Sequence, residues 1–263
     1  SQEGYISKIL KEYNLSNLKK PPSTPATSNL LVPKDGSPPI DKSKYLSLVM
    51  ALMYLGRFTR PDILHTVSYL ASRSSKPTED DYQKLLRVVE YLSGTSEVGL
   101  MFRQNKSGKM VPEIWCDASH AGHPDGHGHA GIIITFGSAP IGTRSFKIKF
   151  ICRSSSESEL YVLEEASTYA VWLQCFLTSM GFELDQPIPI YQDNKSTIIM
   201  ASQGGNFKRT KHLICKESYI KERLLNGDVQ LKYLPTDQMP ADMLTKPTSK
   251  DQLYKHMNKL FIR

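Results

Sequence analysis

Residues 153–166 read RSSSESELYVLEEA, and this stretch predicts the central helix of the fold with one acid on its apolar side. Successive residues of a helix are rotated by about 100° around its axis. By this count Glu159 shares a face with Val162, Leu163 and Ala166, near the N-terminal end of the helix. An ionised carboxylate on a core-facing stripe is unfavourable unless a cation or a donor meets it. Glu159 is therefore either a buried ion-pair residue or a functional acid, and the helix alone favours neither.

The other three glutamates of this stretch fall on the opposite side of the helix. They are Glu157, Glu164 and Glu165, and they are predicted to face solvent. Ser154 and Glu157 also have the spacing of a capping box, in which two side chains bind free backbone N–H groups at the helix start.

Short β-rich segments surround this helix and predict an α/β domain with a mixed sheet. Before the helix come VGLMF (98–102), VPEIWCD (111–117), AGIIITF (130–136) and FKIKFIC (146–152). After it come the strand PIPIYQD (187–193), helical segments over 195–225, the strand DVQLKYLP (228–235) and a short helix, MPADMLTK (239–246). Such an order is typical of a sheet with both parallel and antiparallel pairs.

Three aspartates stand at the ends of these elements. Asp117 ends a predicted strand, where alternation places it on the same face as Trp115. Asp193 ends an apolar strand directly before a helix, and Asp242 lies in the first turn of the short last helix. Each one alone is most simply a strand-end or helix-capping residue. Together with Glu159, however, they follow the order Asp, Glu, Asp, Asp on strand, helix, strand and helix.

Four carboxylates that converge on one small site raise one another's pKa unless positive charge compensates them. Hard divalent cations are the natural compensation, because they prefer carboxylate oxygens as ligands. Two such ions about 3.5–4 Å apart can activate a water molecule and stabilise the leaving oxygen of a phosphodiester. If the four acids converge, the pattern therefore indicates a nuclease.

The N-terminal part of the chain has a different composition and pattern. Residues 1–19 predict a short helix, and the Pro-, Ser- and Thr-rich stretch 19–44 predicts an extended, poorly packed connector. Three helical stretches follow, over 45–58, 60–73 and 78–94. They predict a small helical module.

The composition is that of a globular chain with an acidic partner. The 263 residues are 40% hydrophobic and carry a net charge of +7, which favours nucleic acid as the partner. The four cysteines form no CxxC pair, which argues against a zinc knot or a disulfide framework. No stretch approaches the roughly 18 apolar residues of a membrane span, so no membrane association is expected. Because the chain starts at Ser1 without Met, we expect a fragment or a processed product.

Four histidines gather in a glycine-rich stretch. They are His120, His123, His127 and His129. No cysteine or acid cluster accompanies them, so a flexible surface loop is the favoured interpretation over a metal site.

Several motifs together resemble a known family. The segments SSSESELY (154–161), IYQDN (190–194), RTKHL (209–213) and VQLKYLPTDQMPADMLTKP (229–247) are similar to motifs of the Pol polyproteins of copia-type long-terminal-repeat retrotransposons. The similarity lies in the C-terminal part of those polyproteins, where reverse transcriptase runs into ribonuclease H. Nearly the whole chain takes part in it.

The resemblance implies an RNase H-like α/β fold, with a mixed five-stranded sheet and flanking helices, preceded by a small, mostly helical module. It divides the chain into the end of a polymerase thumb with a Pro-rich linker (1–44), a helical connection module (45–97), the RNase H-like domain (98–250) and a C-terminal tail (251–263). The polymerase signature is absent, so no DNA synthesis is expected of this chain alone.

The resemblance also implies hydrolysis of the RNA strand of an RNA–DNA hybrid, with two Mg²⁺ or Mn²⁺ ions. The catalytic and metal-binding residues would be Asp117, Glu159, Asp193 and Asp242. The nucleic acid would be bound by Lys208, Arg209, Lys211 and His212. The expected partners are the hybrid and the polymerase portion of the same polyprotein. The expected location is intracellular, in a cytoplasmic virus-like particle or the nucleus.

Two alternatives stay open. A decayed or domesticated element would keep the fold and bind nucleic acid or a polymerase partner without catalysis, although all four carboxylates are present. Ser119 and His120 stand where the family usually has an acid and an aromatic residue, which bears on substrate handling. A recombinase or integrase on the same fold fits less well, because those enzymes carry their glutamate on a late helix.

Overall fold

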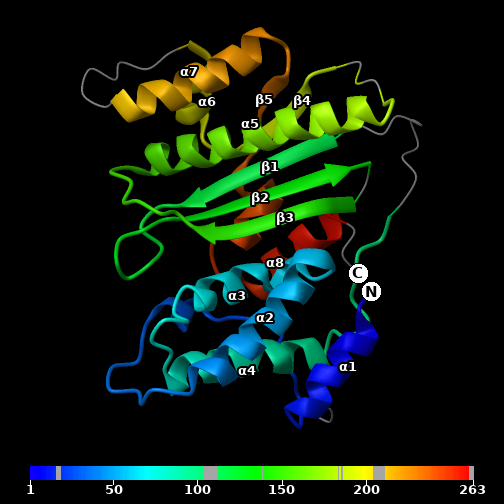
Figure 1. Ribbon diagram of the computed structural model, residues 1–263, viewed down its shortest axis with the longest axis vertical. Helices are drawn as coiled ribbons and strands as arrows, with labels where there is room; N and C mark the ends of the chain where they lie inside the picture. Colours follow the sequence, from blue (N-terminus) through cyan, green and yellow to red (C-terminus); the bar gives the residue numbers. More distant parts are fainter. Residues whose placement is uncertain are drawn as a thin grey trace.

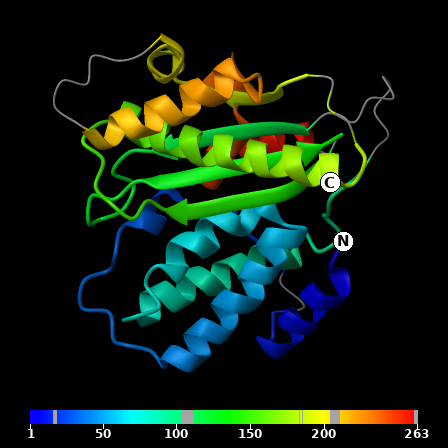
Figure 2. The same cartoon turned by 45° about the horizontal axis from the view of Figure 1, so that its top comes forward.

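The computed structural model describes residues 1–15, 19–102, 112–137, 139–182, 184, 186–203 and 211–260. Helices from residues 155–225 cover one face of a central sheet, and the N-terminal helices and the last helix lie on its other side (Figures 1 and 2). Within the described residues, no helix is both long enough and apolar enough to cross a membrane.

The sheet has five strands, β1 (Pro112–Ser119), β2 (His129–Phe136), β3 (Ala139–Lys147), β4 (Ile188–Gln192) and β5 (Val229–Tyr233). Their order is β3-β2-β1-β4-β5. Strand β2 pairs antiparallel with β1 and β3, whereas β4 pairs parallel with β1 and β5. The predicted mixed five-stranded sheet with flanking helices is confirmed.

Two strand predictions are wrong. Residues 98–102 form none of the five strands, and Leu100 alone takes part in an isolated β-bridge. The third strand is β3 rather than 146–152, because the turn at Gly137, with φ of 74°, starts the new strand directly after β2 ends. The chain then leaves the sheet, and Ile148 and Cys152 are buried in the core on the side of the C-terminal helices.

Helix α5 (Ser155–Ser179) covers this face of the sheet (Figure 1). Ser154 caps it by accepting the Glu157 N–H at 3.2 Å. Glu157 differs from the prediction, since it is buried rather than solvent-facing. Its carboxylate turns back and accepts the Arg153 N–H at 2.7 Å, which satisfies a free backbone donor beside the helix start. Glu159 lies on the buried side of the helix, as predicted.

The core under α5 is made of apolar residues from β1, β2, β4 and α5 itself. Helices α6 (Lys195–Gln203) and α7 (Lys211–Leu225) lie on the outer side of this layer, where both contact α5.

The helical module contains α1 (Glu3–Glu12), α2 (Lys42–Phe58), η2 (Pro61–Ile63), α3 (Leu64–Ala71) and α4 (Glu79–Ser93). These helices share a core of their own, centred on large side chains of α2, α3 and α4. The three predicted helical stretches are confirmed.

The Pro-rich stretch that joins α1 to α2 is packed, contrary to the prediction. It contains the 3₁₀ helix η1 (Ser28–Leu31), and Ala26 and Leu30 are buried in the core of the module. Because proline has no N–H group, a proline-rich chain forms few backbone hydrogen bonds within itself. This stretch instead forms hydrogen bonds with groups of the α4 region. The Glu79 N–H donates to the Pro38 carbonyl at 2.8 Å, and Lys84 donates to a carbonyl of the same stretch.

A third apolar cluster joins the module to the sheet. It is formed by η4 (Pro240–Leu244), by α8 (Lys250–Lys259), by Leu64 of α3 and by the sheet face that carries Trp115. The predicted C-terminal tail is therefore largely a helix, because α8 buries Leu253 and Met257 in this layer.

Gly131 of β2 allows η4 to approach the sheet closely. A Cβ atom at this position would lie 2.7 Å from the Leu244 Cβ and 2.9 Å from the Ala241 carbonyl oxygen. Any larger residue would push η4 away from the sheet, and η4 carries Asp242.

The joint, meaning the contact between the helical module and the sheet, also contains a row of buried imidazole rings. His65 of α3 contacts the ring of His129 edge-on at 4.9 Å between ring centroids, and Tyr69 stacks on His123 at 4.5 Å. The predicted flexible surface loop is thus wrong for His123 and His129, which are 5% and 1% exposed. They are buried because the module covers them, and a sequence window around 120–129 contains no sign of that contact.

Hydrogen bonds in this row require the His129 ring to be neutral. The Ser145 hydroxyl donates to the Leu244 carbonyl at 2.7 Å, so it must accept from His129 Nε2, which is also 2.7 Å away. His129 Nδ1 is then an acceptor for His123 Nε2 at 2.9 Å. Burial lowers the pKa of His129 well below its usual value, and it lowers that of His123 to about 4.

We predict that this row makes the protein sensitive to mild acid. A histidine whose pKa is lower in the folded than in the unfolded state contributes full stability above about pH 6.5, and this contribution is lost as the pH falls. For His129 the loss between pH 7.5 and 5.5 is about 1.4 kcal/mol. Urea unfolding at pH 7.5 and 5.5 should therefore show a smaller pH effect for His129→Gln than for the wild type. The exposed His120, changed to Gln, is the control, and an equal effect in both variants would contradict the prediction.

Candidate metal centre

Two of the four predicted acids meet because β1 and β4 are parallel neighbours. Their ladder ends with Trp115 opposite Tyr191, and each chain continues by two residues to an aspartate, Asp117 and Asp193. The carboxyl ends of parallel strands lie at the same edge of a sheet, which is a common position for functional side chains in α/β folds.

Glu159 reaches this edge from α5. One carboxylate oxygen each of Asp117, Glu159 and Asp193 lies within 4.8 Å of the others. Asp117 and Glu159 are 5% and 6% exposed, whereas Asp193 is half-buried at the rim. Three of the predicted site residues therefore form one cluster.

Asp242 lies beside this cluster on η4. It is fully buried, and the ammonium of Lys246, one turn later, pairs with its Oδ1. Its Oδ2 has no hydrogen-bond donor among the described residues. After burial, the charge of Asp242 is the largest influence that raises the pKa of Asp117. The fourth predicted acid, Asp242, thus influences the same site electrostatically, from η4 rather than from α5.

Neutral donors orient the carboxylates. Gln192 is fully buried, and its Nε2 donates to Glu159 at 3.2 Å while its Oε1 accepts the Asp193 N–H at 2.7 Å. Thr245 donates to Asp117 at 2.5 Å, and Thr236 donates to Asp193 at 2.7 Å.

None of these donors was predicted from the sequence. A buried glutamine in an otherwise apolar strand could have indicated the role of Gln192, since buried amides need partners. The lysine four residues after Asp242 could have indicated the ion pair with Lys246, because residues at this spacing are neighbours on a helical turn. No local signal joins Thr245 to Asp117, which is 128 residues away in the chain.

The carboxylates of the cluster lie close together, with too little positive charge nearby to offset their mutual repulsion. Burial, and then the charges of Asp117 and Asp193, raise the pKa of Glu159 well above its usual value. Burial and the charge of Asp242 raise the pKa of Asp117 to about 7. Burial also raises the pKa of Asp242, against the opposing effect of Lys246.

These residues fit a site for hard divalent cations. All the converging groups are carboxylates, which Mg²⁺ and Mn²⁺ prefer over nitrogen or sulfur ligands. A bound cation would reverse the mutual repulsion that raises the pKa values. The unpartnered Asp242 Oδ2 is a further free ligand atom at the same place.

The predicted nucleic-acid contacts cannot be placed beside this cluster. Lys208 and Arg209 lie outside the described residues, and Lys211 and His212 begin α7 with side chains outside the description. They stay predictions.

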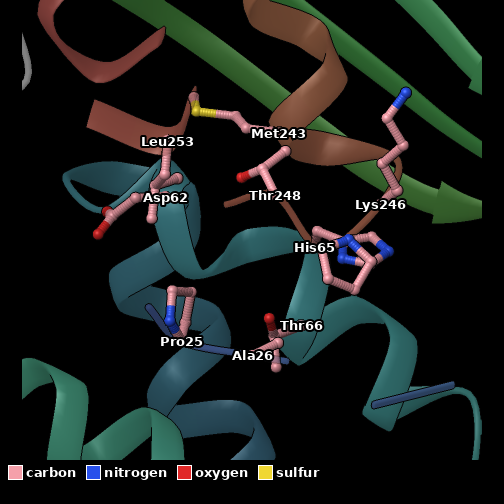
Figure 3. A pocket seen from close by; sticks show the side chains of 10 residues that line it. Pro25, Ala26, Asp62, His65, Thr66, Met243, Lys246, Thr248 and Leu253 are labelled. Atoms are coloured by element: carbon pink, nitrogen blue, oxygen red, sulfur yellow. The ribbon is translucent and has the colours of Figure 1, made fainter. Parts of the chain in front are cut away.

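A small cavity of about 10 Å³ lies where η4 and the residues after it meet the helical module, and Asp62, His65 and Met243 line it (Figure 3). It is too small for more than one water molecule. The side chain of Lys246 starts at the cavity and points away from it, alongside the sheet (Figure 3).

No family model matches the chain. The retrovirus-related Pol polyprotein from transposon RE2 of Arabidopsis thaliana is 32% identical over 252 residues, which are 95% of this chain and 17% of that relative. The Pol polyprotein from transposon TNT 1-94 of Nicotiana tabacum is 30% identical over 98% of this chain and 20% of the relative. The chain thus spans a fifth or less of the length of these curated relatives. Among solved structures, LC11-RNase H1 in complex with an RNA/DNA hybrid aligns with a TM-score of 0.39 and 18% identity, covering 51% of this chain and 93% of that chain.

Proposed function

Because this chain belongs, as a segment of a fifth or less of their length, to the family of retrovirus-related Pol polyproteins of copia-type transposons, we propose that it is a ribonuclease H. Its substrate would be the RNA strand of an RNA–DNA hybrid. Its partner would be the polymerase portion of the same polyprotein, inside the cell, in a virus-like particle or the nucleus.

One observation carries this proposal. Asp117, Glu159 and Asp193 come from two strand ends and a helix, yet their carboxylate oxygens lie within 4.8 Å of one another. Gathering three acids, two of them buried, is unfavourable for folding, so a functional role accounts for the arrangement better than a structural one.

We propose that Asp117, Glu159, Asp193 and Asp242 hold two Mg²⁺ or Mn²⁺ ions. Such ions, when bound, would activate the attacking water and stabilise the leaving oxygen of the phosphodiester. Gln192 would keep the Glu159 carboxylate aimed at the site, and Thr245 would do the same for Asp117. Because these donors are neutral, they orient the carboxylates without competing for the ions.

The experiment that tests the proposal is cleavage of a labelled RNA–DNA hybrid in Mg²⁺ or Mn²⁺, with RNA duplex and DNA duplex as controls. The wild type should cut the RNA of the hybrid alone, and Asp193→Asn should not. If neither protein cuts but both bind the hybrid, the proposal fails in favour of a domain that binds nucleic acid without catalysis.

A further inference from the structure

Lys246 supplies positive charge to a site that consists otherwise of acids. Its ammonium pairs with Asp242 Oδ1, and the charges of Asp242, Asp117 and Asp193 all raise its pKa. Among the ion pairs of the described residues, this is the one that involves any of the four site carboxylates.

The two partners of this pair differ sharply in burial. The Asp242 side chain is 1% exposed, whereas that of Lys246 is 47% exposed. Asp242 is held rigidly in η4, which packs against β2 at Gly131. Lys246 instead follows η4 and reaches the carboxylate from solvent on a long flexible stem, so it can leave without disturbing the core.

A divalent cation that binds both oxygens of Asp242 competes with the Lys246 ammonium, because like charges a few ångströms apart repel strongly at a buried site. The remaining atom, Oδ2, has no donor among the described residues. The carboxylate is therefore only half satisfied by Lys246, which leaves it open to a ligand that binds both oxygens or replaces the lysine.

We propose that Lys246 is an exchangeable counter-ion, which neutralises Asp242 in the metal-free protein and binds a backbone phosphate of the nucleic acid once metal has taken its place. This inference rests on the proposed function, because it needs a metal at the carboxylates and a phosphate beside them. The released ammonium stays at the rim of the site, where a phosphate that approaches the metal-binding carboxylates would meet it.

The first test is the affinity for Mn²⁺ alone, measured by calorimetry on the full chain without nucleic acid. Lys246→Met should bind Mn²⁺ about 10-fold more tightly than the wild type, because the competing cation is gone. Lys246→Arg keeps the charge and should stay within about threefold of the wild type. The matched control is Lys84→Met, which removes another lysine paired with an aspartate four residues earlier, on α4.

The second test is hybrid binding at several KCl concentrations in Ca²⁺, with intact RNA verified on a gel. Loss of one phosphate contact should reduce the slope of log affinity against log salt by about 1 in Lys246→Met, and Lys84→Met should keep the wild-type slope. Urea unfolding verifies that each variant is folded.

The outcomes separate this inference from the proposed function. An unchanged or weaker Mn²⁺ affinity in Lys246→Met would show that the lysine does not compete with metal, and an unchanged salt slope would show that it does not bind phosphate. Either result overturns the inference while leaving a cleaving wild type intact. A wild type that takes up no Mn²⁺ and cuts no hybrid overturns both.

Discussion

Asp117→Asn should abolish hybrid cleavage and at the same time stabilise the metal-free protein at pH 8. Asparagine keeps the size of the side chain and an oxygen that can accept from Thr245, but it removes a charge that burial and Asp242 oppose. Changing a group that only supports a metal ligand typically costs 10- to 100-fold in activity, so loss of a direct ligand should cost at least about 100-fold.

The stability effect follows from the raised pKa. Asp117 has a pKa of about 7 in the folded chain and 3.8 as its ordinary value. A carboxyl group with a raised pKa is most favourable for folding below its unfolded pKa, and this contribution is lost as the pH rises through the folded value. At pH 8 the ionised group therefore opposes folding, and its removal should add about 2–4 kcal/mol to the free energy of unfolding.

Urea unfolding of the wild type and of Asp117→Asn at pH 8 and pH 5, with EDTA and with Mn²⁺, measures this difference in the free energy of unfolding. The gain should be largest at pH 8 in EDTA, and Mn²⁺ should stabilise the wild type more than the variant. Glu164→Gln on the outer side of α5 is the control, since Glu164 pairs with Lys216 near the surface. A variant that loses activity and is also less stable at pH 8 would contradict the electrostatic account.

Arg60→Met should destabilise the helical module by about 3–5 kcal/mol, because it leaves the buried Asp62 without its charge partner. Both residues are nearly inaccessible, and Arg60 donates to the two carboxylate oxygens of Asp62 at 3.0 and 2.7 Å. The guanidinium also binds the carbonyl and hydroxyl of Thr95, and Tyr91 donates to Asp62 at 2.8 Å. The network ties the end of α4 to η2, directly beneath the joint with the sheet.

Urea unfolding of Arg60→Met and of the double variant Arg60→Met/Asp62→Leu distinguishes the effect of the unpaired charge from the effect of lost packing. The double variant should recover much of the loss, because a buried ion pair replaced by apolar residues is often close to neutral. Lys84→Met, which breaks a pair nearer the surface, should cost less than about 1 kcal/mol. Single and double variants of equal stability would show that the charge is not the cause.

The errors of the sequence interpretation have a common origin in contacts between distant segments. The angle of Glu157 on the helix predicts a solvent-facing side chain, but its carboxylate turns back to the Arg153 N–H and is buried there. The glycine-rich stretch predicts a flexible surface loop for His123 and His129, but the helical module covers them. A helical or strand period describes one element, and it cannot indicate which other element will cover it.

The sequence by itself determined the helices, most of the strands and the positions of the site acids on them. The apolar stripe of α5 placed Glu159 inward, and the ends of two β-rich segments placed Asp117 and Asp193 at strand ends, because helical and strand periods depend only on neighbouring residues. Only the tertiary structure decided that these ends meet, since that requires β1 and β4 to be parallel neighbours. It also brought Asp242 and Lys246 to the same place by packing η4 against Gly131, a contact between residues more than a hundred positions apart. Proximity of that kind comes from the burial of two apolar faces against each other, and a one-dimensional pattern does not contain it.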